Sequence, residues 1–291
     1  MLEKLAYNSL QAYIKMMMPT YEFNWHHVAI IRALEDFAFD DTEFLFIEAP
    51  PRHGKSLITS VFFPAWYMGH HPNHEVVIAT YSQDLASKFG RSVRNNVDHK
   101  YFRSIFGFGL SKDSKGKVEF ANQIGGEMHA VGVGSGLTGK GCNLGICDDT
   151  LKGRAEADSK RVRESLHEWF ESTLMTRRAK KSKMIFMQTR WHKEDLIGYV
   201  QKNYTETKSK IIKLPLVNKS ETETLWPSFM NLDKALYLKE KMTPKNWASI
   251  YMQSPMAAQG NIFTKASFRY YKNAPKKFDS KIISADFTFK D

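Results

Sequence analysis

The segment that most constrains the fold is a short loop ending in Gly-Lys-Ser, Ala49-Pro50-Pro51-Arg52-His53-Gly54-Lys55-Ser56. The apolar run at 43–48 before it is typical of a buried strand, and the run at 57–63 after it has no turn signals and predicts a helix. In this setting the loop is predicted to bind phosphate, because its backbone N–H groups and the helix N-terminus can surround an anion. The alternative is a surface loop with a chance Gly-Lys-Ser, which the flanking strand and helix disfavour.

The residues of this loop have distinct expected roles toward ATP. Lys55 supplies a point charge to the phosphates, and the Ser56 hydroxyl is predicted to be a ligand of Mg²⁺. One departure from the usual pattern is Ala49, which stands where the first glycine is expected. Upstream, Trp25 and His26 are candidates to border the adenine, and packing in the core is the alternative for Trp25. The predicted ATP-binding residues are Pro51, Arg52, His53, Gly54, Lys55, Ser56 and Leu57.

Two adjacent carboxylates, Asp148 and Asp149, follow a short apolar strand predicted at 144–147. In a sheet that also carries the phosphate loop, the first acid orients Mg²⁺ through its water shell, and the second activates a water for attack on the γ-phosphate. A carboxylate in the second place favours hydrolysis over transfer to a small molecule. The alternative is an exposed turn before a helix.

Charge that develops between the β- and γ-phosphates calls for an additional cation. Arg52, inside the loop, is the candidate within the same subunit. Lys140 lies on the glycine-rich segment 139–141 and is the candidate for reaching a neighbouring subunit. For any single basic residue of this kind, a solvated surface side chain is the competing interpretation. Further candidates are Arg154, Arg161 and Arg163.

A polar pair, Thr189 and Arg190, ends the strand predicted at 184–188. A polar side chain in this position can sense the γ-phosphate and pass its loss onward, so we predict a coupling role. A helix cap is the alternative for Thr189. The dense basic run at 177–183 is predicted as a loop, and either contact with a phosphate backbone or simple solvation accounts for it.

The composition of the whole chain bears on its partners. Its 291 residues carry a net charge of +11 at pH 7, which favours a polyanion, with nucleic acid as the first candidate and an acidic membrane surface as the second. No apolar run is long enough to span a bilayer, and the N-terminus lacks a signal-peptide pattern, so we expect a soluble intracellular protein. Cys142 and Cys147 show no metal-ligand spacing and fit a reducing compartment.

Short apolar strands alternate with helices along the chain, which predicts an α/β fold whose mostly parallel sheet is covered by helices on both faces. A hairpin is expected over 117–133, around Gly125-Gly126. Helices are expected at 25–39, 83–96 and 159–176, and a further strand at 75–80. The predicted parts are a helical segment at 1–24, a P-loop ATPase core at 25–202, a smaller linker or lid at 203–275, and at 276–291 the first strand of another domain.

Taken in order, several motifs resemble the large terminase subunit of tailed bacteriophages, the motor that packages viral DNA. They lie at 50–56, 137–141, 146–152, 189–196 and 247–255. The resemblance implies an ATPase domain of the additional-strand, RecA-like type with a small lid. It also implies a C-terminal nuclease of the RNase H type, in which Asp286 is the first acid. The other acids are then expected beyond Asp291, so we do not expect this chain to cut DNA.

The same resemblance implies partners and a location. These are double-stranded DNA, the portal protein, the small terminase subunit and a ring of identical subunits in the cytoplasm of an infected bacterium. Relatives commonly carry an arginine finger where this chain has Lys140, and many motors carry Glu where it has Asp149. Two alternatives remain open: another P-loop motor on nucleic acid, such as a helicase, and a non-catalytic DNA-binding assembly protein.

Overall fold

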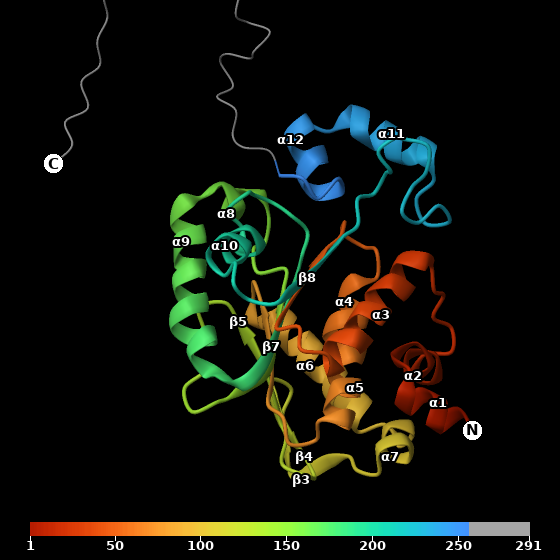
Figure 1. The fold of residues 1–291 in the computed structure, drawn as a ribbon, viewed down its shortest axis with the longest axis vertical. Coiled ribbons are helices and arrows are strands. Elements are labelled where there is room, and N and C mark those ends of the chain that lie inside the picture. Colours follow the sequence, from red (N-terminus) through yellow and green to blue (C-terminus); the bar gives the residue numbers. More distant parts are fainter. Residues whose placement is uncertain (256–291) are drawn as a thin grey trace, which may run out of the picture. The chain divides into compact units, whose positions relative to one another are not determined.

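One sheet organises the chain, and its strands follow the order β3-β4-β5-β2-β6-β7-β1-β8 (Figure 1). From β5 to β8 all neighbours are parallel, and β3 and β4 add an antiparallel edge. The strands are β1 (Phe44–Glu48), β2 (Val76–Thr80), β3 (Leu110–Lys115), β4 (Glu119–Asn122), β5 (Glu127–Gly132), β6 (Cys142–Asp148), β7 (Arg178–Gln188) and β8 (Ser209–Lys213). The predicted mostly parallel α/β fold is therefore confirmed.

This computed structural model describes residues 1–255, except for the side chains of 114 and 115. The predicted strand at 276–291, with Asp286, lies outside the described residues. The α-helices are α1 (Leu2–Asn8), α2 (Leu10–Met17), α3 (Trp25–Phe39), α4 (Lys55–Leu57), α5 (Phe63–His70), α6 (Gln83–Val97), α7 (Lys100–Phe106), α8 (Arg154–Asp158), α9 (Lys160–Trp169), α10 (Leu196–Asn203), α11 (Leu232–Lys241) and α12 (Pro244–Asn246). Wider π-helical turns are η1 (Ile58–Phe62), η2 (Phe170–Leu174) and η4 (Trp247–Tyr251), and η3 (Met175–Arg177) is a 3₁₀ turn.

Both faces of the sheet are buried. Successive side chains of a strand point to opposite faces, so the central strands β2, β6, β7 and β1 contribute to two hydrophobic clusters. In β1, Leu45 and Ile47 join one hydrophobic cluster, which includes side chains of α1, α2, α3, α5 and α6. Phe44 and Phe46 join the other cluster, with side chains of α9 and α10. Figure 1 shows these two groups of helices on opposite sides of the strands. The four residues 44–47 are accordingly all apolar, as a strand buried on both faces requires.

The predicted hairpin is confirmed: β4 pairs with β5 in antiparallel register, and Gly125 has φ of 110° in the turn between them. The structure differs from the sequence prediction at 177–183. Most of this basic run extends β7 and is not a loop, because Arg178 pairs with Cys142 of β6. Two of its basic side chains contact other parts of the same chain. The Arg178 guanidinium contacts Glu43, and Lys183 Nζ donates to the carbonyl oxygen of Thr42.

The sheet continues past residue 202, where the predicted ATPase core ends. β8 pairs with β1 along its whole length, so the strand at 209–213 belongs to this sheet and not to a separate lid. Beyond it, Leu216, Leu225 and Trp247 are buried in the same hydrophobic cluster as α3. Residues 1–255 accordingly belong to one compact unit. Among the described residues, no helix is both long and apolar enough to cross a membrane.

Candidate nucleotide-binding site

The loop from Ala49 to Ser56 connects β1 to α4 at the carboxyl edge of the parallel strands. Two of its residues have left-handed backbone conformations, Arg52 with φ of 62° and Gly54 with φ of 76°. A Cβ atom on Gly54 would lie 2.5 Å from Nε2 of His27, so both the backbone angle and the close approach require glycine here. The loop therefore has the tight turn that a phosphate-binding loop needs.

Lys55 is buried at the base of the loop, and its ammonium group connects three strands. Nζ donates to Thr189 Oγ1 at 2.6 Å and to the carbonyl oxygen of Ala49 at 3.3 Å. It also lies 3.3 Å from Oδ2 of Asp149. These contacts bring the ends of β1, β6 and β7 together around one cation, as the sequence predicts for Lys55, Asp149 and Thr189.

Asp148 is fully buried between two hydroxyl groups. Ser56 Oγ donates to Oδ1 at 3.3 Å, and Ser60 Oγ donates to Oδ2 at 2.7 Å. Burial and the neighbouring charge of Asp149 raise the pKa of Asp148. Oxygen donors of this kind are the ligands that Mg²⁺ takes, so the residues present fit the predicted metal. Ser60 was missed by the sequence prediction, although a polar residue one helical turn after Ser56, inside an apolar run, was a usable signal.

Asp149 has a positive φ of 43°, which is uncommon for aspartate. This conformation accompanies a carboxylate that faces the loop: Oδ1 accepts the backbone N–H of Thr189 at 2.8 Å, and Oδ2 faces Lys55. Backbone strain of this kind is found mainly at functional sites. Asp149, Lys55 and Thr189 thus form one contact network at the place where the predicted γ-phosphate would lie.

Arg190 is 7% exposed and contacts Glu48, Asp195 and Gln253. Its guanidinium lies 2.7 Å from Oε1 of Glu48 and 2.9 Å from Oδ2 of Asp195. Its backbone N–H donates to Oε1 of Gln253 at 3.1 Å. The strand that precedes the loop is therefore linked to the segment at 247–255 through this residue. Glu48, Asp195 and Gln253 were not predicted, since only their buried position reveals a role.

The two predicted finger residues lie in different places. Arg52 is exposed on the loop itself. Lys140 precedes β6, whereas Asp148 is the last residue of β6 and Asp149 follows it, so about 20 Å of strand separates Lys140 from the site. Lys140 forms an ion pair with Glu119 at the amino edge of the strands. The structure does not bring Lys140 together with the loop of the same subunit. Of the other candidate arginines, Arg163 is buried and pairs with Glu194.

Two buried histidines of α3, His26 and His27, contact the backbone of the loop. Nε2 of His26 and Nε2 of His27 lie 3.1 and 3.2 Å from the carbonyl oxygen of His53. Nδ1 of His27 accepts the backbone N–H of Asn24 at 3.0 Å, and Nδ1 of His26 lies 2.8 Å from the Asn24 amide nitrogen. Both rings are satisfied as neutral imidazoles that donate through Nε2. Trp226 packs against both histidine rings and that of His53, so His26 packs in the core.

We predict that stability falls as the pH is lowered through the range of these histidines. Burial lowers the pKa of His26 and of His27 from 6.5 to about 4. The unfolded chain therefore binds more protons than the folded one between pH 6.5 and 4, and the free energy of unfolding decreases by up to about 1.4 kcal/mol per pH unit for each group. Urea unfolding at a series of pH values measures this slope.

The matched variant is His26→Gln, in which an amide nitrogen can still donate to the His53 carbonyl oxygen but the side chain no longer titrates. Its unfolding free energy should depend less steeply on pH over the same range. The slope that remains belongs to other histidines with a lowered pKa, such as His71. An unchanged slope in this variant would show that His26 does not contribute to the acid sensitivity.

Comparison with known proteins places this site in a family. A family model described as the N-terminal part of the terminase large subunit, T4-like-virus type, matches residues 46–269. This range includes the loop, both acids and the predicted coupling pair. No curated protein sequence matches the chain.

Two solved structures share the fold. The HK97 bacteriophage large terminase has a TM-score of 0.56 and 12% identity over 86% of this chain and 55% of its own. A mutant ATPase domain of the Thermus phage P74-26 large terminase has a TM-score of 0.51 and 12% identity over 84% of this chain and 98% of its own. The chain thus spans about half of the HK97 protein. From the matched family model, the RecA-like α/β fold and the loop geometry, we conclude that this chain belongs to the large-terminase family of tailed bacteriophages, in which it corresponds to the N-terminal region.

Proposed function

We propose that this chain is an Mg²⁺-dependent ATPase that drives double-stranded DNA into a viral procapsid. The observation that carries the proposal is the position of the Asp149 carboxylate, which lies between Lys55 and Thr189 beside the phosphate loop. Membership of the terminase family supports the biological setting. A phosphate loop alone would support only nucleotide binding.

The contacts among Lys55, Thr189 and Asp149 support hydrolysis of ATP. Lys55 is held at the loop by Thr189 and Asp149, and ATP phosphates would compete for its positive charge. Asp149 is then free to accept a proton from the attacking water, which is the role of a general base. Ser56 and Asp148 would hold Mg²⁺, which neutralises charge on the phosphate oxygens. Arg52, exposed on the loop, remains our proposed cation in the same subunit, and Lys140 our proposed cation toward a neighbouring one.

The route from hydrolysis to movement is proposed to run through Thr189 and Arg190. Thr189 contacts Lys55, and the next residue contacts Glu48, Asp195 and Gln253. A change at the γ-phosphate that moves Thr189 would also move the buried guanidinium. Gln253 belongs to the segment that we propose as linker or lid, so movement of Arg190 would also move this segment.

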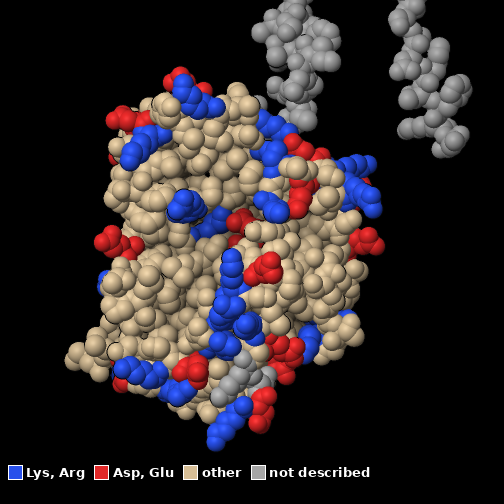
Figure 2. Space-filling model, turned by 180° about the vertical axis from the view of Figure 1, so that it is seen from behind, with Lys and Arg blue, Asp and Glu red and all other residues tan. Residues whose placement is uncertain are grey.

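DNA, the portal protein and the small terminase subunit are proposed partners, with several copies of the chain in a ring in the host cytoplasm. The net charge of +11 supports a polyanionic partner. On the face seen in Figure 2, Lys and Arg side chains gather in a column along the middle of the molecule. The nuclease acids of the family, beginning at Asp286, lie outside the described residues.

The test is ATP hydrolysis by the purified chain, measured as phosphate release with and without Mg²⁺ and double-stranded DNA. We expect hydrolysis that requires Mg²⁺ and is lost in Lys55→Ala, which removes the charge that holds the phosphates. A strand-displacement assay separates the alternatives: unwinding of a duplex would favour a helicase. Tight ATP binding without phosphate release would favour a non-catalytic assembly protein.

A further inference from the structure

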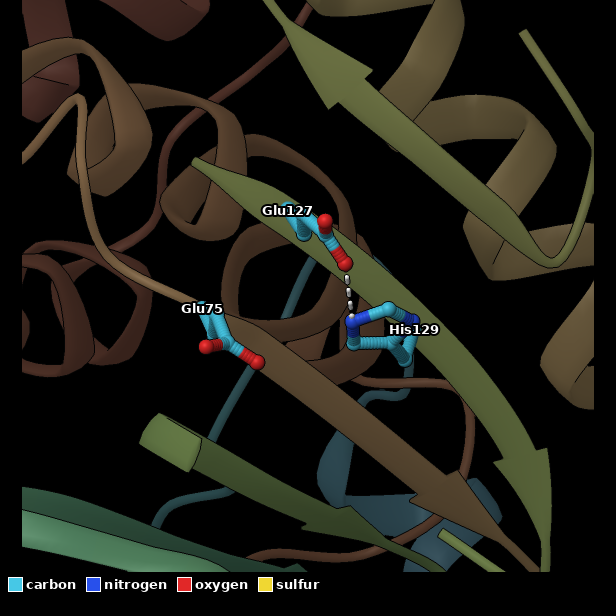
Figure 3. A group of neighbouring side chains, drawn as sticks. All are labelled: Glu75, Glu127 and His129. Atoms are coloured by element: carbon cyan, nitrogen blue, oxygen red, sulfur yellow. Dashed lines mark ion pairs between the residues drawn. The ribbon is translucent and has the colours of Figure 1, made fainter. Parts of the chain in front are cut away.

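Three side chains converge at the amino edge of the sheet, away from the phosphate loop: Glu75, Glu127 and His129 (Figure 3). One ligand atom from each lies within 4.8 Å of the others. Glu127 and His129 are two residues apart in β5 and therefore share a face of the strand. Glu75 immediately precedes β2, the parallel neighbour of β5. The parallel register of these two strands, and not sequence proximity, brings the third group to the other two.

His129 supplies an observation independent of the acidic residues. It is 3% exposed, and its Nε2 has no hydrogen-bond partner among the described residues. This atom points toward the carboxylates and lies 3.1 Å from Oε2 of Glu127 (Figure 3). Burial and the nearby Lys140 charge lower the pKa of His129. A buried ring nitrogen that is aimed at carboxylates and has no hydrogen-bond partner among the described residues is an arrangement that a cation would satisfy.

The surrounding groups resemble those around a ligating histidine in metal sites. Oε2 of Glu119 lies 3.9 Å from the other ring nitrogen, Nδ1 of His129, where an outer carboxylate commonly orients the ring. Lys140 pairs with Glu119 and not with the three ligand candidates. The backbone N–H of Gly141 donates to Oε2 of Glu75, which leaves Oε1 available. A Cβ atom on residue 141 would lie 2.7 Å from that oxygen, so glycine keeps the space open.

The charges are also suited to a divalent ion. Glu75, Glu119 and Glu127 carry three negative charges and Lys140 carries one positive charge, which leaves two negative charges for a cation to neutralise. One imidazole with two carboxylates suits Zn²⁺, whereas Mg²⁺ favours oxygen ligands alone. We propose that Glu75, Glu127 and His129 bind Zn²⁺ and that this ion joins the start of β2 to the start of β5. The site is separate from the Ser56–Asp148 site, which lies at the other end of β6.

The test uses the full chain, stripped of metal and free of nucleotide. Titration with Zn²⁺ by calorimetry should show one site, and bound Co²⁺ should show the visible absorption of a low-coordinate site with an imidazole ligand. Glu127→Gln, at a partly exposed ligand, should weaken Zn²⁺ binding by at least about 100-fold, and Glu119→Gln should weaken it by about 10-fold through the outer carboxylate. Asp113→Asn, an exposed carboxylate on β3, is the matched control and should leave the affinity unchanged.

Several outcomes would overturn the proposal. One is the absence of a Zn²⁺ site in the stripped wild-type chain, and another is equal affinity in wild type and Glu127→Gln. A third is loss of the site in Asp148→Asn, because the ion would then have bound beside the phosphate loop. Zn²⁺ should also raise the melting temperature of wild type and of Asp148→Asn but not of Glu127→Gln. Because His129 is buried, His129→Gln can fail to fold, so the proposal is judged on Glu127→Gln and Glu119→Gln.

Discussion

Replacing Asp149 with asparagine is expected to reduce ATP hydrolysis by about 10³-fold or more while ATP binding is retained. Asparagine has nearly the same shape and can still accept the Thr189 N–H through its amide oxygen, so the left-handed turn is preserved. It cannot take a proton from water, and it no longer offsets the charge of Lys55. Phosphate release measures the loss of hydrolysis, and binding of a fluorescent ATP analogue measures the retained affinity for ATP.

Two further variants make this result specific. Lys55→Ala should lose both binding and hydrolysis, because it removes the cation that holds the phosphates. Thr189→Val removes the hydroxyl that contacts Lys55 but keeps the backbone N–H that contacts Asp149, so its effect should be smaller than that of Asp149→Asn. Hydrolysis at the wild-type rate in both Lys55→Ala and Asp149→Asn would contradict the site assignment.

Replacing Arg190 with methionine is expected to destabilise the fold by about 3 to 5 kcal/mol. Glu48 is 3% exposed and Asp195 is 1% exposed, and the variant leaves both carboxylates buried without their cation. Burial already raises the pKa of Glu48 even with Arg190 present. The difference in unfolding free energy between wild type and variant should therefore shrink as the pH is lowered, because protonation removes the unpaired charges. Urea unfolding at two pH values measures both effects.

The matched control is Arg91→Met, on the exposed face of α6, which should change stability by less than about 0.5 kcal/mol. A cost for Arg190→Met no larger than that of the control would show that the buried pairs contribute nothing. Gln253→Ala tests the coupling without removing a charge, because it removes two hydrogen bonds, one from the Arg190 backbone N–H to Oε1 and one from Nε2 to the carbonyl oxygen of Ile250. If the proposed coupling is right, double-stranded DNA stimulates ATP hydrolysis by the wild-type chain, whereas this variant hydrolyses ATP without that stimulation.

Much of the site could be predicted from local patterns. The loop at 49–56 follows an apolar strand, and Asp148 and Thr189 also stand at or just after strand ends. Parallel strands place their carboxyl ends at one edge of a sheet, so residues in these three places meet where their strands are neighbours, as β6, β7 and β1 are. The structure brings Lys55, Asp149 and Thr189 together for that reason. Ser56 reaches Asp148 by the same logic.

Other features depended on packing that no local pattern contains. Periodicity does not show which strands are neighbours, so the pairing of β8 with β1 and the meeting of Glu75 with β5 could not be inferred. The basic composition of 177–183 suggested a loop, yet pairing with β6 makes most of it a strand. Lys140 was predicted to reach the site of a neighbouring subunit, and only the structure shows that an entire strand separates it from the acids of its own subunit.

The sequence by itself determined the chemistry of the loop and the identity of the acids, because these depend on residue types at fixed short spacings along the chain. It also determined the α/β fold, since apolar strands alternate with helices. Only the tertiary structure decided that Arg190 is a buried link between Glu48, Asp195 and Gln253, and that Lys140 stands at the other edge of the sheet. Such contacts join residues that are distant in sequence. The free energy of these charge pairs depends on burial, and burial exists only once the strands are assembled.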